Sequence, residues 1–303
     1  MAQRAGFAGS VIARGEITSI RSPRVKAARQ LAKRSFRQRA RSFLAEGPQA
    51  VREALARREN PGPAATLGEA VPGAAGSGPP VVTELFVTAA AWARHAELAG
   101  QAAGQGAAVH TVSGEVMAEL AQTVTPQGVL AVCRFVDVPL EQLVAAAPRL
   151  VVLLANVRDP GNAGTVLRTA DAAGADGVIF SDASVDPYNS KCVRASAGSL
   201  FHLPVVAGAP LRQAAAELSR AGVRILAADG SARLELGELD ANGSLSSPTA
   251  WLFGNEAWGL PADLLALADE AVAVPIYGRA ESLNLAAAAA VCLYASARCQ
   301  RGG

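Results

Sequence analysis

Polar residues follow apolar runs at four places in the second half of this sequence. They are residues 156–168 (NVRDPGNAGTVLR), 189–199 (NSKCVRASAGS), 252–260 (LFGNEAWGL) and 277–284 (YGRAESLN). Their asparagine, arginine, glutamate and serine side chains can position a polar ligand, stabilise charge and assist one proton transfer. The three histidines are scattered elsewhere and no carboxylates have metal-ligand spacing. The sequence therefore predicts no catalytic triad, no metal site and no paired-carboxylate hydrolase.

The first cluster combines two glycines with an asparagine and an arginine. Gly161 and Gly164 allow a tight turn and close backbone approach, and Asn162 is predicted to cap the following helix. Arg168 would lie about 1.7 turns into that helix, so its side chain can reach back over the turn. Two other interpretations stay open, an arginine that pairs with a neighbouring carboxylate and a dinucleotide-binding loop, although GxGxxG is absent.

The second and third clusters each have a structural alternative. Lys191 and Arg194 share a helix face, so they either contact phosphate or are ordinary surface bases. In the third cluster the chain leaves a strand through Gly254, followed by the polar residues Asn255 and Glu256. The alternative to a binding site is an ordinary turn or helix cap, since this pair is common at strand ends. Trp258 could supply a stacking face there.

The fourth cluster precedes an Ala-rich helix expected at residues 282–297. Glu281, Ser282 and Asn284 lie in the turn before it, where free N–H groups and the positive end of the helix dipole favour a ligand. The helix is apolar almost all round, so another surface must cover it.

Apolar strands alternate with helices throughout this half of the chain. This pattern predicts a parallel sheet covered on both faces, with ligands bound outside the carboxyl ends of the strands. The predicted strands are 150–155, 177–180, 203–206, 223–227, 250–253 and 271–275, and the predicted helices are 163–173, 190–197, 211–221, 261–267 and 282–297.

The length of 303 residues allows two domains. We predict a flexible arm at 1–20, an α/β domain at 21–138 with a flexible Gly/Pro-rich insertion at 59–80, a linker at 139–149 and a second domain at 150–303. The predicted strands of the first domain are 42–45, 81–87, 108–111 and 128–135, and its helices are 24–34, 48–58, 90–98 and 114–121.

Positive charge is concentrated at the N-terminal end. Residues 1–59 hold 14 Lys and Arg against four acids, although the whole chain carries only +2. This asymmetry indicates a polyanionic partner, with a solvated basic helix face as the alternative. The four cysteines lack paired spacing, which disfavours zinc and disulfides. The apolar run at 285–297 is shorter than the roughly 20 residues of a membrane span, and no signal peptide is evident. We expect a cytoplasmic protein without membrane contact.

In chain order, these residues resemble the SpoU (TrmH-like) family of RNA ribose 2′-O-methyltransferases, within the SPOUT superfamily. Residues 191–198 also look like the family's stretch between its first two motifs. The three matching motifs are Asn162-x-Gly164-x3-Arg168 preceded by Asp159-Pro160, Phe253-Gly254-Asn255-Glu256 with Gly259-Leu260, and Ile276 and Gly278 with Ser282-Leu283-Asn284-Leu285-Ala286 and Leu293-Tyr294.

The resemblance implies an α/β SPOUT domain with a C-terminal trefoil knot, which binds S-adenosylmethionine and forms a homodimer. Arg168 would polarise the ribose hydroxyl, although a base whose pKa exceeds about 12 suits charge stabilisation better. The implied catalytic residues are Arg168, Asn162, Glu256, Ser282 and Asn284. The implied cofactor-binding residues are Leu252, Phe253, Gly254, Asn255, Ile276, Ser282, Leu283, Asn284 and Leu285.

The first half resembles the family's L30e-like RNA-binding domain, whose usual opening matches residues 43–47 (FLAEG). The layout implies structured RNA as substrate, with 23S ribosomal RNA expected first and tRNA as the alternative. A non-catalytic RNA-binding or ribosome-assembly protein and a nucleotide-dependent oxidoreductase are the competing classes. The expected RNA contacts are Arg24, Lys26, Arg29, Lys33, Arg34, Arg37, Lys191 and Arg194.

Overall fold

The computed structural model describes residues 15–58, 78–255 and 258–302. Its described part forms two compact units, one made of residues 15–58 and 79–134 and the other of residues from 135 onward. The sequence analysis placed the boundary after Val138. Residues 135–138 pack with the second unit instead, because the Val138 N–H donates to the Val205 carbonyl at 2.9 Å and the Val136 N–H donates to the Tyr188 hydroxyl at 2.8 Å.

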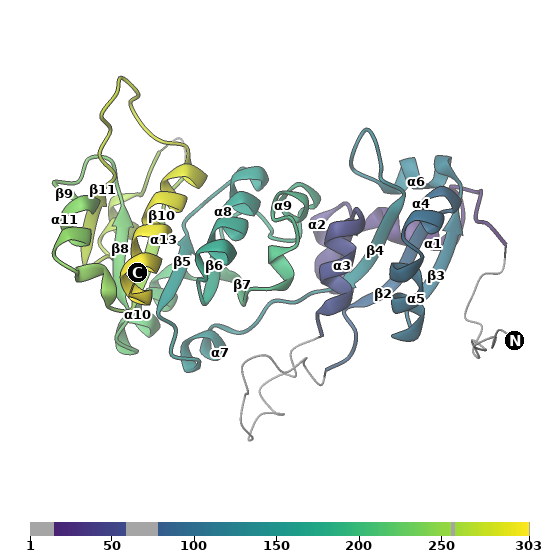
Figure 1. The fold of residues 1–303 in the computed structure, drawn as a ribbon, viewed down its shortest axis with the longest axis horizontal. Coiled ribbons are helices and arrows are strands. Elements are labelled where there is room, and N and C mark those ends of the chain that lie inside the picture. Colours follow the sequence, from purple (N-terminus) through teal and green to yellow (C-terminus); the bar gives the residue numbers. More distant parts are fainter. Residues whose placement is uncertain (1–14, 59–77, 256–257, 303) are drawn as a thin grey trace, which may run out of the picture. The chain divides into compact units, whose positions relative to one another are not determined.

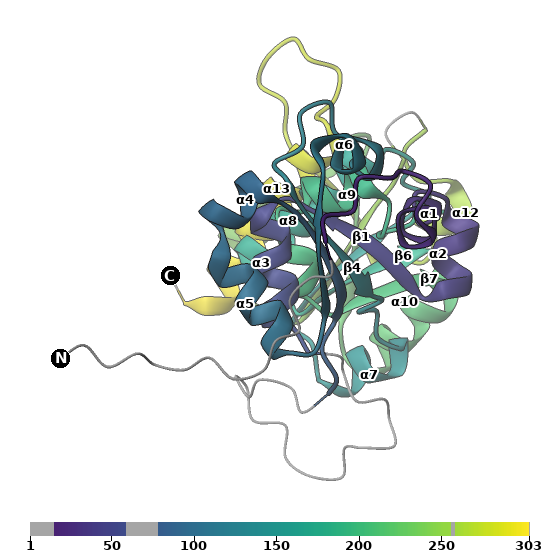
Figure 2. The same cartoon turned by 90° about the vertical axis from the view of Figure 1, so that its right-hand side faces the viewer.

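The first unit is a four-stranded mixed sheet with helices on both faces (Figure 2). Its order is β1 (Ser42–Glu46), β4 (Val129–Arg134), β2 (Val82–Thr88) and β3 (Ala108–Val112). Strand β4 is antiparallel to both neighbours, whereas β2 and β3 are parallel. One face packs against α1 (Pro23–Gln30) and α6 (Gly114–Leu120). The remaining helices are α2 (Arg34–Ala40), α3 (Pro48–Ala56), α4 (Ala89–Arg94) and α5 (Ala96–Gly104).

The N-terminal part of this unit differs from the expectation in two ways. Residues 15–20 are not a loose arm: the Ile17 N–H donates to Thr111 at 2.8 Å, and Ile17 packs against the core of the unit. The helix expected at 24–34 ends at Gln30, and a second helix, α2, begins at Arg34 after a turn at residues 31–33. The rest of the expected arm, and residues 59–77 of the expected insertion, lie outside the described residues.

The second unit is a seven-stranded sheet in which every pairing is parallel, as the sequence predicted. The six predicted strands are present. The seventh strand, β9, has only two residues, too few to show a pattern. The order is β7 (Val205–Ala209), β6 (Gly177–Ser181), β5 (Leu150–Leu154), β10 (Thr249–Phe253), β8 (Arg224–Ala228), β11 (Glu270–Ala273) and β9 (Leu234–Glu235).

Helices cover both faces of this sheet (Figure 1). A buried apolar cluster joins one face to α7 (Leu140–Ala145) and α10 (Leu211–Arg220), with α12 (Ala262–Leu265) packed against it. The other face carries α8 (Pro160–Ala173), α9 (Ser190–Ala195), α11 (Leu236–Ala241) and α13 (Leu285–Arg301). The fully buried Trp251 fixes α13 to β10, since its indole N–H donates to the Ser296 hydroxyl at 2.8 Å.

The strand order creates a switch point between β5 and β10. From β5 the chain proceeds to β6 and β7 on one side, whereas β10 leads to β11 on the other. The two strands are adjacent and in register, with Leu154 opposite Phe253 at their carboxyl ends. Ligands of open parallel sheets bind outside the carboxyl ends at such a point.

No helix in the described ranges is long and apolar enough to cross a membrane.

Candidate functional site

The loop after β5 is held by hydrogen bonds from two neighbouring strands. Asn156 has a left-handed backbone (φ 56°), and its N–H donates to the Ser181 hydroxyl at 3.0 Å. Its carbonyl accepts a hydrogen bond from the side-chain amide of Asn255, at 2.9 Å. The Ser184 hydroxyl donates to the Leu154 carbonyl at 3.0 Å and accepts from the Val157 N–H at 3.1 Å. The loops after β5, β6 and β10 are therefore one bonded unit.

Sequence reasoning missed these two serines. A single serine after a strand is common and gives no signal that its hydroxyl binds a neighbouring loop.

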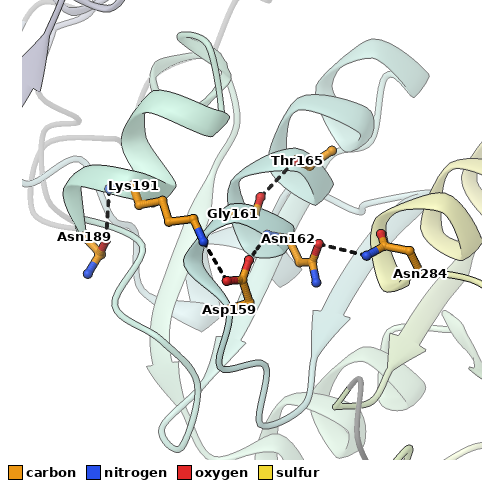
Figure 3. Close-up of polar contacts among 7 residues, drawn as sticks. All are labelled: Asp159, Gly161, Asn162, Thr165, Asn189, Lys191 and Asn284. Carbon is orange, nitrogen blue, oxygen red and sulfur yellow. Dashed lines mark hydrogen bonds and ion pairs between the residues drawn. The ribbon is translucent and has the colours of Figure 1, made fainter. Parts of the chain in front are cut away.

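Helix α8 begins at a charged cap directly after that loop (Figure 3). The cap is Asp159 rather than the expected Asn162, and its carboxylate accepts the Asn162 N–H at 2.8 Å. Lys191 at the start of α9 donates to the other carboxylate oxygen at 2.8 Å. This hydrogen bond from Lys191, followed by the one from the Asn162 N–H, lowers the pKa of Asp159. The carboxylate is thus kept ionised at the helix N-terminus, where negative charge is favoured.

Of the two glycines expected to allow close backbone approach, Gly164 is the one that lies against another backbone. A Cβ atom at Gly164 would lie 2.3 Å from the Cys192 carbonyl oxygen and 2.7 Å from the Ala195 Cβ. A Cβ atom at Gly161 would meet only side-chain atoms, the nearest being the Asp159 carboxylate at 2.8 Å. Gly164 therefore fixes the contact between the two helix backbones.

The loop after β10 closes a tight turn. The backbone groups of Asn255 and Gly259 exchange two hydrogen bonds, of 3.0 Å and 2.8 Å. A Cβ atom at Gly254 would lie 2.4 Å from the Gly259 carbonyl carbon. Gly254 is thus required for close approach. The expected cofactor residues Leu252 and Phe253 are buried within β10, and the expected catalytic Glu256 lies outside the described residues.

The third motif meets the first through one side-chain contact. The amide of Asn284 donates to the Asn162 side-chain oxygen at 3.1 Å (Figure 3). Asn284 also caps α13, because its oxygen accepts the Ala286 N–H at 2.9 Å. The structure therefore brings two of the five expected catalytic residues together, from segments 122 residues apart.

Most of the remaining residues of the third motif are exposed and form few hydrogen bonds. Ile276, Ser282 and Leu283 are exposed, whereas Leu285 is buried at the start of α13. Within the described part of the chain, residues 276–283 form no backbone hydrogen bond. Figure 1 shows this yellow segment extending away from the sheet ahead of α13.

Arg168 forms no hydrogen bond with Asn162 or Asn284. It is exposed, and among the described residues it has no hydrogen bond or ion pair. Six residues of helix separate Arg168 from Asn162, a rotation of about 240° around the axis and a rise of about 9 Å. The guanidinium therefore stands on a different side of α8 from the pair formed by Asn162 and Asn284.

The expected RNA contacts divide into four groups by their surroundings. Lys26, Lys33 and Arg34 are exposed and have no side-chain partner in the described part of the chain. Arg24, Arg29 and Lys191 pair with the acids Glu84, Glu119 and Asp159, and Arg194 is half-buried.

Arg37 has a structural position instead. It is only 3% exposed and donates to the Leu31 and Ala32 carbonyls at 3.0 and 2.8 Å. This location does not suit the phosphate contact expected for it, because its donors satisfy the backbone between α1 and α2.

A groove of about 800 Å³ lies between α8, α11 and α13. Its lining is mostly apolar and includes the exposed side chains of Val291 and Tyr294 on α13, with Ala172 on α8. The ion pair of Asp240 with Arg298 lies at its border and lowers the pKa of Asp240. The groove is on the flank of the helices and does not include Asn162 or Asn284.

Three family models match the sequence. Residues 149–294 match the SpoU rRNA Methylase family, residues 69–139 match the RNA 2′-O ribose methyltransferase substrate binding domain, and residues 22–62 match the MRM3-like substrate binding domain.

Known proteins resemble the chain over most of its length. It is 34% identical to the Bacillus subtilis 23S rRNA (guanosine(2553)-2′-O)-methyltransferase RlmP, covering 92% of this chain and 98% of that protein. It is 36% identical to the Streptomyces viridochromogenes 23S rRNA (uridine(2479)-2′-O)-methyltransferase, over 57% of this chain and 61% of that protein. The AdoMet-bound rRNA methyltransferase of Sinorhizobium meliloti aligns with a TM-score of 0.74 at 30% identity, covering 94% of this chain and 97% of that one.

Proposed function

The chain belongs to the SpoU family and is an S-adenosylmethionine-dependent RNA methyltransferase, and we propose that it methylates a ribose 2′-OH of 23S rRNA. One observation carries the proposal: the first and third motifs meet through Asn162 and Asn284 beside the switch point of the sheet. The two relatives named above act on a guanosine and a uridine. Their names therefore support the RNA class without choosing a base.

The residues of the third motif fit a cofactor with an adenine ring and several polar groups. Residues 276–283 offer backbone donors and acceptors that no other described group uses. Ile276 and Leu283 add exposed apolar surface beside them. We infer that these residues, with Gly254 and the buried Leu285 as borders, hold S-adenosylmethionine, which supplies an electrophilic methyl group when bound.

Arg168 has the charge that the reaction needs. A ribose hydroxyl is a poor nucleophile near neutral pH, and its oxygen gains negative charge as the proton leaves. The guanidinium only donates hydrogen bonds, so Arg168 orients the hydroxyl and an adjacent phosphate and stabilises that charge. The proton passes to solvent or a phosphate oxygen. Asn162, Ser282 and Asn284 position the substrate, and Glu256 is proposed to share this role.

The path of the C-terminal segment supports a trefoil knot. Strand β10 is inserted between β5 and β8, and after β11 the chain returns to pack α13 along α8 and β10. Buried contacts hold that return, including the bond of Trp251 to Ser296. We infer that the segment passes through the loop after β10, which would bring the third motif beside the second.

The first unit is proposed to be an L30e-like domain that binds RNA. A four-stranded sheet between two helical layers supports the fold. The exposed cations Lys26, Lys33 and Arg34 support the binding, since phosphate contacts supply affinity independent of sequence.

We propose a homodimer formed through the second unit, in the cytoplasm, where the substrate is made. The apolar groove beside α13 supports the dimer, because exposed Val291 and Tyr294 would be covered by a second copy. Light scattering of wild type and of Val291→Glu tests this proposal. We expect wild type to be a dimer and Val291→Glu to be a monomer. A monomeric wild type would overturn the proposal.

The test of function is transfer of labelled methyl from S-adenosylmethionine to 23S rRNA, 16S rRNA and bulk tRNA in parallel. We expect label in an alkali-resistant dinucleotide of 23S rRNA alone. Arg168→Ala should reduce the rate about 100- to 1000-fold, the range for loss of one charge-stabilising donor. Arg212→Ala, an exposed arginine on α10, is the control and should retain full activity.

Other outcomes would redirect the proposal. Label on tRNA alone would support the alternative substrate. Cofactor binding without transfer to any free RNA would indicate an assembled particle as substrate. No cofactor binding would contradict the enzyme and leave an RNA-binding or ribosome-assembly role.

A further inference from the structure

An arginine and a tryptophan form a stacked pair at the carboxyl edge of the second sheet. Arg158 lies in the loop after β5, and Trp258 lies in the turn after the neighbouring strand β10. The guanidinium carbon is 4.9 Å from the centre of the indole ring. Trp258 is nevertheless 67% exposed, the largest aromatic side chain among the exposed apolar residues of the described chain. Neither residue belongs to the catalytic or cofactor set proposed above.

Hydrogen bonds connect the described residues beside this pair. The side-chain amide of Asn255 links the two loops through the Asn156 carbonyl at 2.9 Å. The turn that presents Trp258 is closed by the two backbone hydrogen bonds between Asn255 and Gly259, and Gly259 has the left-handed φ of 64°. The ring therefore lies on the surface and does not contribute to a core. A single exposed aromatic side chain is common, so it is the pairing of this ring with the Arg158 guanidinium, at the edge where the two loops meet, that points to a ligand.

We propose that Arg158 and Trp258 form a stacking platform for a nucleobase of the RNA substrate, next to the ribose that is methylated. This inference rests on the proposed function. Bases of single-stranded RNA stack on aromatic rings and on guanidinium planes, and the indole supplies the first surface while Arg158 supplies the second. A platform of this kind tolerates any base, since every base has a π-face.

The charge of the pair distinguishes an RNA base from the cofactor's adenine. S-adenosylmethionine is a net cation, so the Arg158 guanidinium repels it. An RNA nucleotide brings a phosphate, which the same guanidinium attracts. The platform also adjoins the start of α8, where Asn162 and Asn284 meet, because Arg158 directly precedes the Asp159 cap. A base stacked there can hold its ribose near the first motif.

The experiment compares Trp258→Ala, Trp258→Phe and Arg158→Gln in the full-length protein. The probe is unmodified 23S rRNA transcript, and the readouts are the KM for RNA, the Kd for S-adenosylmethionine and the kcat. Loss of one base–aromatic stack weakens binding about 10- to 100-fold. We therefore expect Trp258→Ala to raise the KM for RNA by about that factor with cofactor affinity unchanged, and Trp258→Phe to stay within about threefold because a phenyl ring still stacks. Arg158→Gln should raise the KM about tenfold.

A second readout does not depend on turnover. In a Trp92→Phe background, which removes the half-buried tryptophan of the first unit, the exposed Trp258 and the buried Trp251 remain. RNA should quench the fluorescence of this protein, and the further change Trp258→Phe should abolish the quenching. Such quenching supports the platform even in a protein that neither binds S-adenosylmethionine nor transfers a methyl group, in which case the proposed function alone fails.

Three results would overturn the platform. Methyl transfer with an unchanged KM for RNA in Trp258→Ala would remove it and leave the proposed function intact. A weaker Kd for S-adenosylmethionine in Trp258→Ala would assign the ring to the cofactor. If Trp258→Ala eluted as a smaller species than wild type in size-exclusion chromatography, the indole ring would be assigned to a contact between two copies of the chain. Trp258→Phe guards against a folding defect, since it retains a ring at the same exposed position.

Discussion

The loops after β5 and β11 leave the same edge of one parallel sheet, yet the chain holds them very differently. In the β5 loop, Asn156 bonds to Ser181 at the end of β6, Val157 bonds to Ser184 after it, and Asp159 bonds to Lys191. In the β11 loop, residues 276–283 are exposed and form no backbone hydrogen bond within the described chain. The Asn284–Asn162 contact joins the two loops.

Under the proposed function, this difference separates the part of the site that the fold builds from the part that the cofactor completes. The β5 loop is pre-organised, so its geometry does not depend on a bound molecule, which lowers the entropic cost of catalysis. The backbone donors and acceptors of the β11 loop are available, which the proposed cofactor site requires.

The sharpest contrast is between two leucines that are two residues apart. Leu285 is 7% exposed at the start of α13, whereas Leu283 is 40% exposed in the β11 loop. Leu285→Ala should lower the free energy of unfolding by about 3 kcal/mol, as buried leucines do. Leu283→Ala should change it by less than about 1 kcal/mol in the unliganded protein while weakening S-adenosylmethionine binding. Urea unfolding and calorimetry measure the two effects. Equal destabilisation would mean that the β11 loop is held by the chain itself.

A matched pair of glycines tests the rigid region. Gly164→Ala forces a methyl group against the Cys192 carbonyl and should cost about 2 to 3 kcal/mol of unfolding free energy, because a backbone must shift. Gly161→Ala meets only the side chains of Asp159 and Lys191, and should cost no more than about 1 kcal/mol. Chemical denaturation of the two variants compares them directly. Comparable losses would show that α8 and α9 are not in backbone contact.

The hydrogen bond between Asn284 and Asn162 can be removed without removing the cap of α13. Asn284→Ala removes both the cap of α13 and the bond to Asn162, and should cost about 1 kcal/mol of stability. Asn284→Asp keeps an oxygen for the Ala286 N–H but cannot donate to Asn162. It should therefore retain stability and still reduce methyl transfer. Thermal unfolding measures the effect on stability, and the labelled-methyl assay measures the effect on activity. Full activity in Asn284→Asp would exclude a role in methyl transfer for the hydrogen bond between Asn284 and Asn162.

The smallest effect is expected at the ion pair that caps α8. The pKa of Asp159 is lowered by Lys191, so the stabilisation is present above the usual aspartate pKa and is lost as pH falls through the lowered one. Lys191→Gln should therefore differ from wild type most near neutral pH and converge with it only as the pH falls below the lowered pKa of Asp159. Both side chains are exposed, so the difference should stay below about 1 kcal/mol. Lys191→Arg is the control, and a difference that grows with acidity would contradict the sign.

Much of the fold was predictable because its signals are local. Continuous apolar runs indicated the six longer parallel strands, and the Gly161–Gly164 spacing indicated close backbone approach. The Asn162 cap was wrong, since Asp-Pro offers an equally good cap and only the structure shows that the Asp159 carboxylate receives the Asn162 N–H. The division of the basic helix was missed for a similar reason, because the buried role of Arg37 depends on carbonyls that the turn at 31–33 leaves free.

The site was predictable as a set of motifs but not as an arrangement. Family resemblance grouped Asn162, Asn284 and Arg168, yet the bond between the asparagines depends on how a segment 122 residues away returns to α8. The position of Arg168 on another side of that helix follows from helix geometry, but its free exposure depends on what surrounds it. The stacking of Arg158 on Trp258 could not be predicted, since it requires β5 and β10 to be neighbours.

Hydrogen–deuterium exchange with and without S-adenosylmethionine tests the central claim most directly. We predict strong protection of residues 276–285 on cofactor addition, and little change at residues 156–162, whose N–H groups at 156, 157 and 162 are already bonded. NAD should protect neither segment. Unchanged exchange at 276–285, or protection of 156–162 that is equally large, would contradict the division into a loop built by the fold and a loop completed by the cofactor.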